Sequence, residues 1–117
     1  MEESRREKLL QAGVNIESAM ERFIGNEELL VRFLKKFPDD PNYGQLKDAM
    51  SSKNYQDAFT AAHTMKGLCG NLSLNDLFEI VSRETECLRH GQHDEAEEIF
   101  PELTAEYEKV VAILETI

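Results

Sequence analysis

Residues that start and stop helices divide this chain into segments of helical length. Asn15, Asn26, Asn54 and Asn75 each precede such a segment, and an asparagine side chain in that position bonds the first free amides of a helix. No stretch alternates apolar and polar residues over the length of a strand, and no two-residue hairpin turn occurs. The segments expected to be helical are residues 3–12, 16–24, 27–37, 41–53, 55–72, 76–90 and 95–117.

Glycine, proline and aspartate mark the other boundaries. Gly13 and Gly91 stand just past two helix ends, where a residue with left-handed backbone is favoured. Pro38 ends the third helix, and Asp94 is expected to open the last one. Pro101 lies inside that last helix and predicts a kink or a short break, because proline removes one backbone hydrogen bond.

These boundaries predict an all-α fold. The four longest segments have short connections, which favours an antiparallel up-down four-helix bundle with additional short N-terminal helices. A chain of 117 residues has the size of one domain. We expect a single domain over residues 1–117, with an N-terminal helix over residues 1–12 and the bundle over residues 13–117.

Composition narrows the classes of partner. Thirteen Lys and Arg residues stand against 23 Asp and Glu residues, which gives a net charge of −10. Such a surface repels phosphate backbones and argues against a nucleic-acid partner. No apolar run reaches membrane-spanning length, the charged start is no signal peptide, and the two cysteines lack close spacing. We therefore expect a cytoplasmic protein with free thiols and no membrane insertion.

The segment from residue 55 to residue 72 carries a histidine beside two helix glycines. His63 lies at the edge of the apolar stripe, and Gly67 and Gly70 follow it one and two turns later. Glycine inside a helix costs about 0.5–1 kcal/mol relative to alanine, so two glycines here suggest a surface cleared for close approach to the His63 ring. The residues expected to form the apolar stripe are Tyr55, Ala58, Phe59, Ala62, Met65, Cys69 and Leu72.

Three interpretations of His63 follow from residue chemistry. A neutral imidazole with Lys66 at i+3 could act as a nucleophile toward an activated phosphoryl group, whose charge the ammonium would neutralise. It could instead act as a general base, which would need a closed pocket around the ring. The third interpretation is a surface histidine with glycines kept for helix packing. Residue chemistry alone leaves the nucleophile and the surface histidine about equally favoured.

The stretch "AHTMKGLCGNLSLNDL" resembles the phosphorylation-site helix of the histidine-containing phosphotransfer (HPt) family. His63, Lys66 and Gly67 fill the fixed positions of the family's H-x-x-K-G signature, and Leu72 and Leu77 fill its spaced apolar positions. The similarity extends upstream, includes "AF..AAHT" before the histidine, and covers nearly all of the chain from about Gly13 onward. One position departs from the family: Ser73 stands where a second glycine is common, which leaves the exact helix end open.

The resemblance implies a four-helix bundle and a phosphorelay carrier. His63 would be the phosphoacceptor, Lys66 would stabilise the phosphoryl group, and Gly67 and Gly70 would clear the docking surface. The implied partners are response-regulator receiver domains and a hybrid sensor histidine kinase. The implied chain is a monomer with no enzymatic activity of its own, and it binds no cofactor or metal, since magnesium would come with the receiver. This agrees with the absence of a glycine-rich nucleotide loop from the sequence.

Other residues of the chain suggest alternatives to this hypothesis. His90 and His93 form H-x-x-H, but a zinc site needs two more ligands, so a solvated helix end is favoured. Cys69 and Cys87 are expected in apolar helix faces, and Glu84 either reaches solvent from the edge of a stripe or bonds inside. The alternative function is a non-phosphorylated helical adaptor that docks receiver domains or other signalling proteins. The phosphocarrier hypothesis requires an exposed His63 ring above a buried stripe.

Overall fold

The computed structural model describes residues 1–117, and its regular structure is helical throughout. The predicted all-α class is confirmed. A single isolated bridge, between Val14 and Leu74, is the only strand-like pairing. The helices in chain order are α1 (Glu3–Gln11), α2 (Ile16–Arg22), α3 (Glu27–Lys36), the 3₁₀ helix η1 (Phe37–Asp39), α4 (Asn42–Ser51), α5 (Tyr55–Asn71), α6 (Asn75–Arg89) and α7 (His93–Leu114).

Three of the four expected asparagine caps are present. The Oδ1 atoms of Asn15, Asn26 and Asn54 each accept a hydrogen bond from the backbone amide three residues later, at 3.0–3.1 Å. The fourth expectation is wrong, because Asn75 is the first residue of α6 rather than its cap. Its backbone N–H donates to the carbonyl oxygen of Gly13 at 2.9 Å, so a contact with a distant segment sets this helix start.

The last helix also differs from expectation at two points. α7 begins at His93, before the expected opening at Asp94. Pro101 lies inside α7, and the helix continues to Leu114, so the short break is absent and the alternative expectation, a kink, stays a prediction. With 22 residues, α7 is the longest helix and runs about 33 Å along the molecule.

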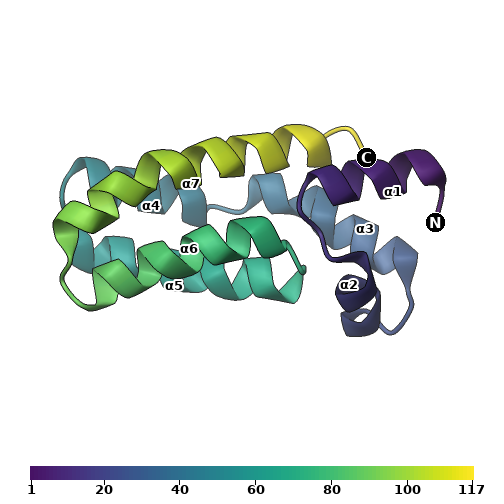
Figure 1. Cartoon of the computed structure of the whole chain (residues 1–117), viewed down its shortest axis with the longest axis horizontal. Coiled ribbons are helices and arrows are strands. Elements are labelled where there is room, and N and C mark those ends of the chain that lie inside the picture. Colours follow the sequence, from purple (N-terminus) through teal and green to yellow (C-terminus); the bar gives the residue numbers. More distant parts are fainter.

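Helices α4 to α7 pack in the order of the chain. α5 packs against α4 on one side and α6 on the other, and α6 packs against α7 (Figure 1). The molecule is elongated, with extents of 43 × 23 × 19 Å. The N-terminal helix α1 lies against the C-terminal part of α7, where Lys8 Nζ donates to the carbonyl oxygen of Thr116 at 3.1 Å. α2 and α3 occupy the same end of the molecule (Figure 1).

One continuous hydrophobic core joins these helices. It includes Leu9 of α1 and extends to Leu114 of α7. The inward face of α5 is lined largely by small residues, among them Ala58, Ala61 and Ala62, all of them buried. Small side chains allow neighbouring helices to approach closely, and they leave larger residues of α5 for its edges. None of the helices is long and apolar enough to span a lipid bilayer.

The C-terminus of α5 ends in a Schellman motif built on a serine. The backbone amide of Ser73 donates to Gly70, and that of Leu74 donates to Cys69 at 3.0 Å. Ser73 has φ +53°, the left-handed conformation for which glycine is the usual residue. Its hydroxyl lies 3.0 Å from the hydroxyl of Ser18 in α2. The helix therefore ends where the family's glycine would stand, with a hydrogen bond to α2 in addition.

Candidate functional site

His63 lies in the middle of α5 with its side chain exposed. The ring takes part in no ion pair. Its ring centre lies 5.8 Å from that of Phe59, one turn earlier on the same helix, with the planes inclined by 20°. The phenyl ring thus supports one side of the imidazole and leaves the rest of it open to solvent.

The seven-residue stripe beneath His63 is buried as predicted at five positions, Ala58 among them, and is half-buried at Tyr55 and Phe59. Ala62, Met65, Cys69 and Leu72 are all buried. Phe59 is only half-buried, because it lies at the edge between α5 and α6. Burial raises the pKa of the Cys69 thiol to about 12, so this cysteine is a neutral core residue at physiological pH.

Gly67 and Gly70 have different surroundings. A Cβ atom built on Gly67 meets no atom within 4 Å, so the surface one turn beyond His63 is open. A Cβ atom built on Gly70 would lie 3.3 Å from Cε2 of Phe78 in α6. The missing side chain of Gly70 therefore accommodates the Phe78 ring, which is a packing contact between α5 and α6. Its expected role in clearing a docking surface stays a prediction.

Lys66 lies on α5 at i+3 from His63 and is half-buried. Its ammonium forms no ion pair within 4.0 Å. Residues three apart on a helix are neighbours on its surface. The charge of Lys66 is therefore available to an anionic group placed on the His63 ring.

Beside this part of α5, the C-terminal turn of α6 carries a charged cluster that sequence reasoning missed. Arg89 Nε donates to Glu86 Oε1 at 3.2 Å, and His90 Nε2 lies 3.4 Å from Glu86 Oε2. The guanidinium carbon of Arg89 also lies 5.0 Å from the centre of the Phe59 ring, on which His63 stacks. The i, i+3 and i, i+4 spacings predict the pairs on α6, but only the packing of α5 on α6 brings them to Phe59.

The electrostatics of Glu86 connect this cluster to Lys66. The hydrogen bond from Arg89 lowers the pKa of Glu86, desolvation opposes this, and electrostatic interactions with Arg89, His90 and Lys66 lower it further. Lys66 therefore lies close enough to Glu86 for its charge to act on the carboxylate. Glu86 therefore pairs directly with Arg89 of its own helix and lies in the field of Lys66 on α5.

The two remaining histidines point to different neighbours. The ring of His90 faces the Glu86 carboxylate, whereas the ring of His93 stacks on Tyr55 at a centroid distance of 3.9 Å. Tyr55 in turn donates its hydroxyl to Glu97 at 2.9 Å, which raises the pKa of Tyr55. No three His, Cys, Asp or Glu side chains converge as they would around a metal ion. The H-x-x-H pattern therefore does not bring its two rings to a common point.

Glu84 takes neither of the two positions considered for it from the sequence. Its side chain is completely buried, and both carboxylate oxygens lack a hydrogen-bond partner. Burial raises its pKa to about 8, the negative charge of Glu97 adds to this effect, and Arg83 opposes it. A carboxyl group in this state is protonated at neutral pH and belongs to the core of the bundle.

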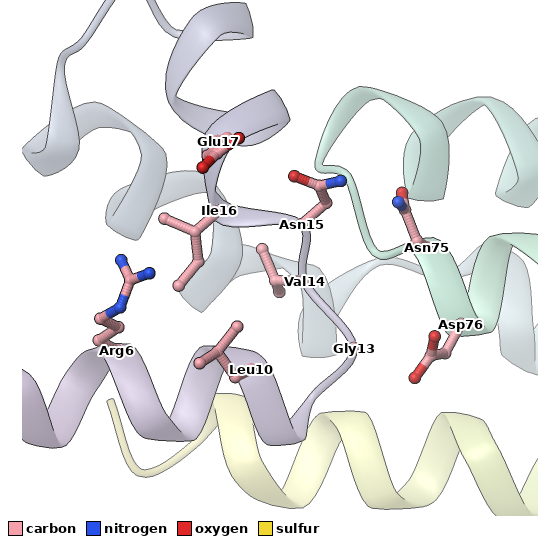
Figure 2. A pocket seen from close by; sticks show the side chains of 9 residues that line it. All are labelled: Arg6, Leu10, Gly13, Val14, Asn15, Ile16, Glu17, Asn75 and Asp76. Carbon is pink, nitrogen blue, oxygen red and sulfur yellow. The ribbon is translucent and has the colours of Figure 1, made fainter.

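The surface also has a hollow away from His63, at the junction of α1, α2 and α6. Figure 2 shows Arg6 and Leu10 of α1 on one side of it and Asn75 and Asp76 of α6 on the other. The Asp76 carboxylate lies so close to Gly13 that a Cβ atom there would meet Asp76 Oδ2 at 2.7 Å. His63 lies about 12 Å along α5 from the helix end near this hollow, so the hollow is not part of its surroundings.

Comparison with known proteins places the chain in one family. A search of curated proteins gave no match, and a search of solved structures gave none. The family model for the Hpt domain matches residues 28–113 of the 117 residues, which include α4 to α6 entirely and almost all of α3 and α7. The chain therefore belongs to the Hpt domain family, the histidine-containing phosphotransfer family that the H-x-x-K-G stretch resembles.

Proposed function

We propose that this protein is a phosphorelay carrier in two-component signalling and that His63 is its phosphoacceptor. It would accept a phosphoryl group from the aspartate of one receiver domain and pass it to the aspartate of another. Membership of the Hpt family supports this class of function. The single observation that carries the choice of residue is the exposed His63 ring, with open space at Gly67 one turn away and Lys66 beside it.

The proposed reaction needs no protein pocket on this chain. An unprotonated ring nitrogen of His63 attacks the phosphorus of the acyl phosphate on the receiver. The bond from phosphorus to the carboxylate oxygen breaks, and its electron pair returns to the aspartate. The proton on the other ring nitrogen stays in place, so no base is required on this helix. Onward transfer is the reverse step, with a new aspartate carboxylate as the attacking group.

Lys66 is the proposed source of electrostatic stabilisation. Charge develops on the oxygens of the phosphoryl group as it passes between the two proteins, and a fixed ammonium beside His63 would stabilise it. The absence of an ion pair at Lys66 supports this role, because no carboxylate needs to be displaced from direct contact with it.

The other parts of the relay are proposed to lie outside this chain. Receiver domains and a hybrid sensor histidine kinase would be the partners, and the magnesium used in transfer would be bound by the receiver. We propose that the chain acts as a monomer without kinase or phosphatase activity of its own. α4 to α7 would be the antiparallel four-helix bundle typical of the family, and they present α5 with His63 on the outside.

The proposal is tested by loading a purified receiver domain with radiolabelled phosphate and mixing it with this protein. The expected product is protein-bound phosphate that is labile in acid and stable in base, as phosphohistidine is. His63→Gln should carry no label, whereas His93→Gln, a matched change at another exposed histidine outside the Glu86 cluster, should be labelled normally. Label that persists in His63→Gln would contradict the choice of residue. Binding of the receiver by the native protein without any labelling would favour the adaptor function instead.

A further inference from the structure

The charged cluster on α6 contacts Phe59, the residue on which the proposed phosphoacceptor stacks, without being part of the H-x-x-K-G stretch. Glu86 bonds Arg89 at 3.2 Å and lies 3.4 Å from the His90 ring. Arg89 lies over the outer ring of the stack formed by Phe59 and His63, at 5.0 Å from the Phe59 centre. The guanidinium is therefore separated from the imidazole by one phenyl ring.

Each member of the cluster is free to rearrange. The side chains of Glu86, Arg89 and His90 are 48%, 42% and 63% exposed, so none is locked by packing. Arginine has a long side chain whose guanidinium binds phosphate oxygens in two-pronged geometry. A phosphoryl group on His63 would bring a dianion next to Lys66 on the same helix, and Arg89, one phenyl ring away, would have to turn from Glu86 to reach it. It would then offer both cations a stronger partner than a single carboxylate.

We propose that Glu86 competes with the phosphoryl group on His63 for Lys66 and Arg89, and that it thereby raises the free energy of the phosphorylated state. This inference rests on the proposed function. In the free protein, Glu86 holds Arg89 in an ion pair and lies in the field of Lys66. In the phosphorylated protein, Glu86 must give up part of both interactions and stands near a second negative group. Glu86 is in this sense a positioning residue, which acts through the two cations and favours release of the group to the next acceptor.

The expected size of the Glu86 effect follows from the solvent exposure of its ion pair. Ion pairs in contact with solvent are screened, and most contribute little individually. Removal of the Glu86 charge should therefore increase the equilibrium phosphorylation constant of His63 about two- to fivefold, a size typical for one exposed pair. The effect should shrink at high salt, whereas a change in folding or in helix packing would not depend on salt in this way.

The test uses potassium phosphoramidate as donor, so that no partner protein is needed. The P–N bond of phosphoramidate breaks, its electron pair leaves with ammonia, and a ring nitrogen of His63 forms the new P–N bond. Phosphorus NMR then gives the phosphorylated fraction at a fixed ratio of phosphoramidate to ammonium. We expect a higher fraction in Glu86→Gln than in the native protein. Glu98→Gln should match the native protein, because it removes the same charge from an exposed position on α7.

A second measurement tests the competition between Glu86 and a phosphate anion in the unphosphorylated protein. Inorganic phosphate is titrated into each unmodified protein while NMR follows the side-chain signals of Lys66 and Arg89. Both signals should saturate at a lower phosphate concentration in Glu86→Gln than in the native protein. Equal behaviour of the two proteins in this titration overturns the inference, and so does an equal gain in Glu98→Gln. Failure of phosphoramidate to modify His63, with His63→Gln as blank, would instead contradict the proposed function.

Discussion

The ring of Phe78 lies where a side chain at Gly70 would begin, since a Cβ atom on Gly70 would stand 3.3 Å from Phe78 Cε2. One turn earlier, on the side toward His63, a Cβ atom on Gly67 would meet nothing within 4 Å. Two glycines that look equivalent in the sequence therefore have different surroundings. Gly70 allows α5 and α6 to pack, and only Gly67 leaves open surface beside the histidine.

This difference predicts that alanine substitutions at the two glycines have different effects on the free energy of unfolding. Gly67→Ala should raise the free energy of unfolding by up to about 1 kcal/mol, because alanine is the better helix former and its methyl group meets no neighbour. Gly70→Ala should be less stable than Gly67→Ala, since Phe78 must shift by a few tenths of an ångström. Urea unfolding of both variants measures the difference.

The same variants separate access from stability. Gly67→Ala should transfer phosphoryl groups more slowly than the native protein, because its methyl group stands on the surface that a receiver must approach. A variant that is more stable and also fully active would show that clearance at residue 67 has no role. A large loss of stability in Gly67→Ala would contradict the open surroundings of this residue.

Substitution of His63 should affect chemistry and leave folding almost unchanged. His63→Gln removes the nucleophile, so phosphate uptake from a loaded receiver should be lost. The ring is exposed, and surface substitutions usually change stability by no more than about 0.5 kcal/mol. Thermal unfolding followed by circular dichroism measures the second quantity. A strongly lowered melting temperature would identify a structural histidine.

Lys66 should affect the rate of transfer without affecting the identity of the acceptor. Lys66→Gln should slow phosphoryl transfer roughly ten- to a hundredfold. This reduction in rate is no larger than the one seen when a single charge-stabilising donor is removed from an enclosed active site. Rapid-quench kinetics with a loaded receiver measures the rate. Lys47→Gln on the exposed surface of α4 is the matched control and should transfer at the native rate.

Helix content and the position of His63 could be predicted because they depend on local rules. Asn15, Asn26 and Asn54 cap their helices through side chains three residues from the bonded amide, and this spacing is visible in the sequence. Asn75 looks the same in the sequence and is not a cap. Its amide is bound by the carbonyl of Gly13, a partner 62 positions away, and no local rule contains that contact.

The missed parts of the site depend on how helices pack against one another. The pairs of Glu86 with Arg89 and His90 follow from spacing along α6, but their relevance to His63 depends on the contact of Arg89 with Phe59 across two helices. That contact requires the register of α5 against α6. Glu84 is a similar case, because its place on a stripe is visible and its complete burial is set by the packing around α6.

Ser73 offers a test of backbone strain at the end of α5. The variants Ser73→Ala and Ser73→Gly both lose the hydroxyl hydrogen bond to Ser18. They differ in how much free energy the residue needs to adopt a backbone φ of +53°. Alanine bears a left-handed penalty of about 1–2 kcal/mol, and glycine does not. Part of this advantage is lost to the greater freedom of glycine in the unfolded chain. Ser73→Gly should therefore be more stable than Ser73→Ala by about 1 kcal/mol in urea unfolding, and equal stabilities would contradict the left-handed conformation.

Glu84 makes stability depend on pH in a direction opposite to that of most carboxylates. Burial raises its pKa from 4.5 to about 8, so between these values the folded chain holds a proton that the unfolded chain has released. The unfolded state then binds fewer protons, and the free energy of unfolding falls as pH rises through this window. Above about pH 8 the group ionises in the folded protein as well, and this dependence ends. One pKa unit corresponds to about 1.4 kcal/mol, so the loss from pH 5 to pH 8 is roughly 2–4 kcal/mol.

Removal of the acid should therefore stabilise the protein most at alkaline pH. Glu84→Gln keeps the shape of the protonated side chain and cannot ionise, so it should be close to the native protein at pH 5 and more stable by roughly 2–4 kcal/mol at pH 8. Glu84→Met fills a similar volume and also removes the two unpartnered oxygens, so it should be at least as stable as Glu84→Gln. Urea unfolding at both pH values measures the differences, and all other carboxylates cancel when each variant is compared with the native protein. A gap between the native protein and Glu84→Gln that stays constant from pH 5 to pH 8 would show that Glu84 titrates normally in the fold.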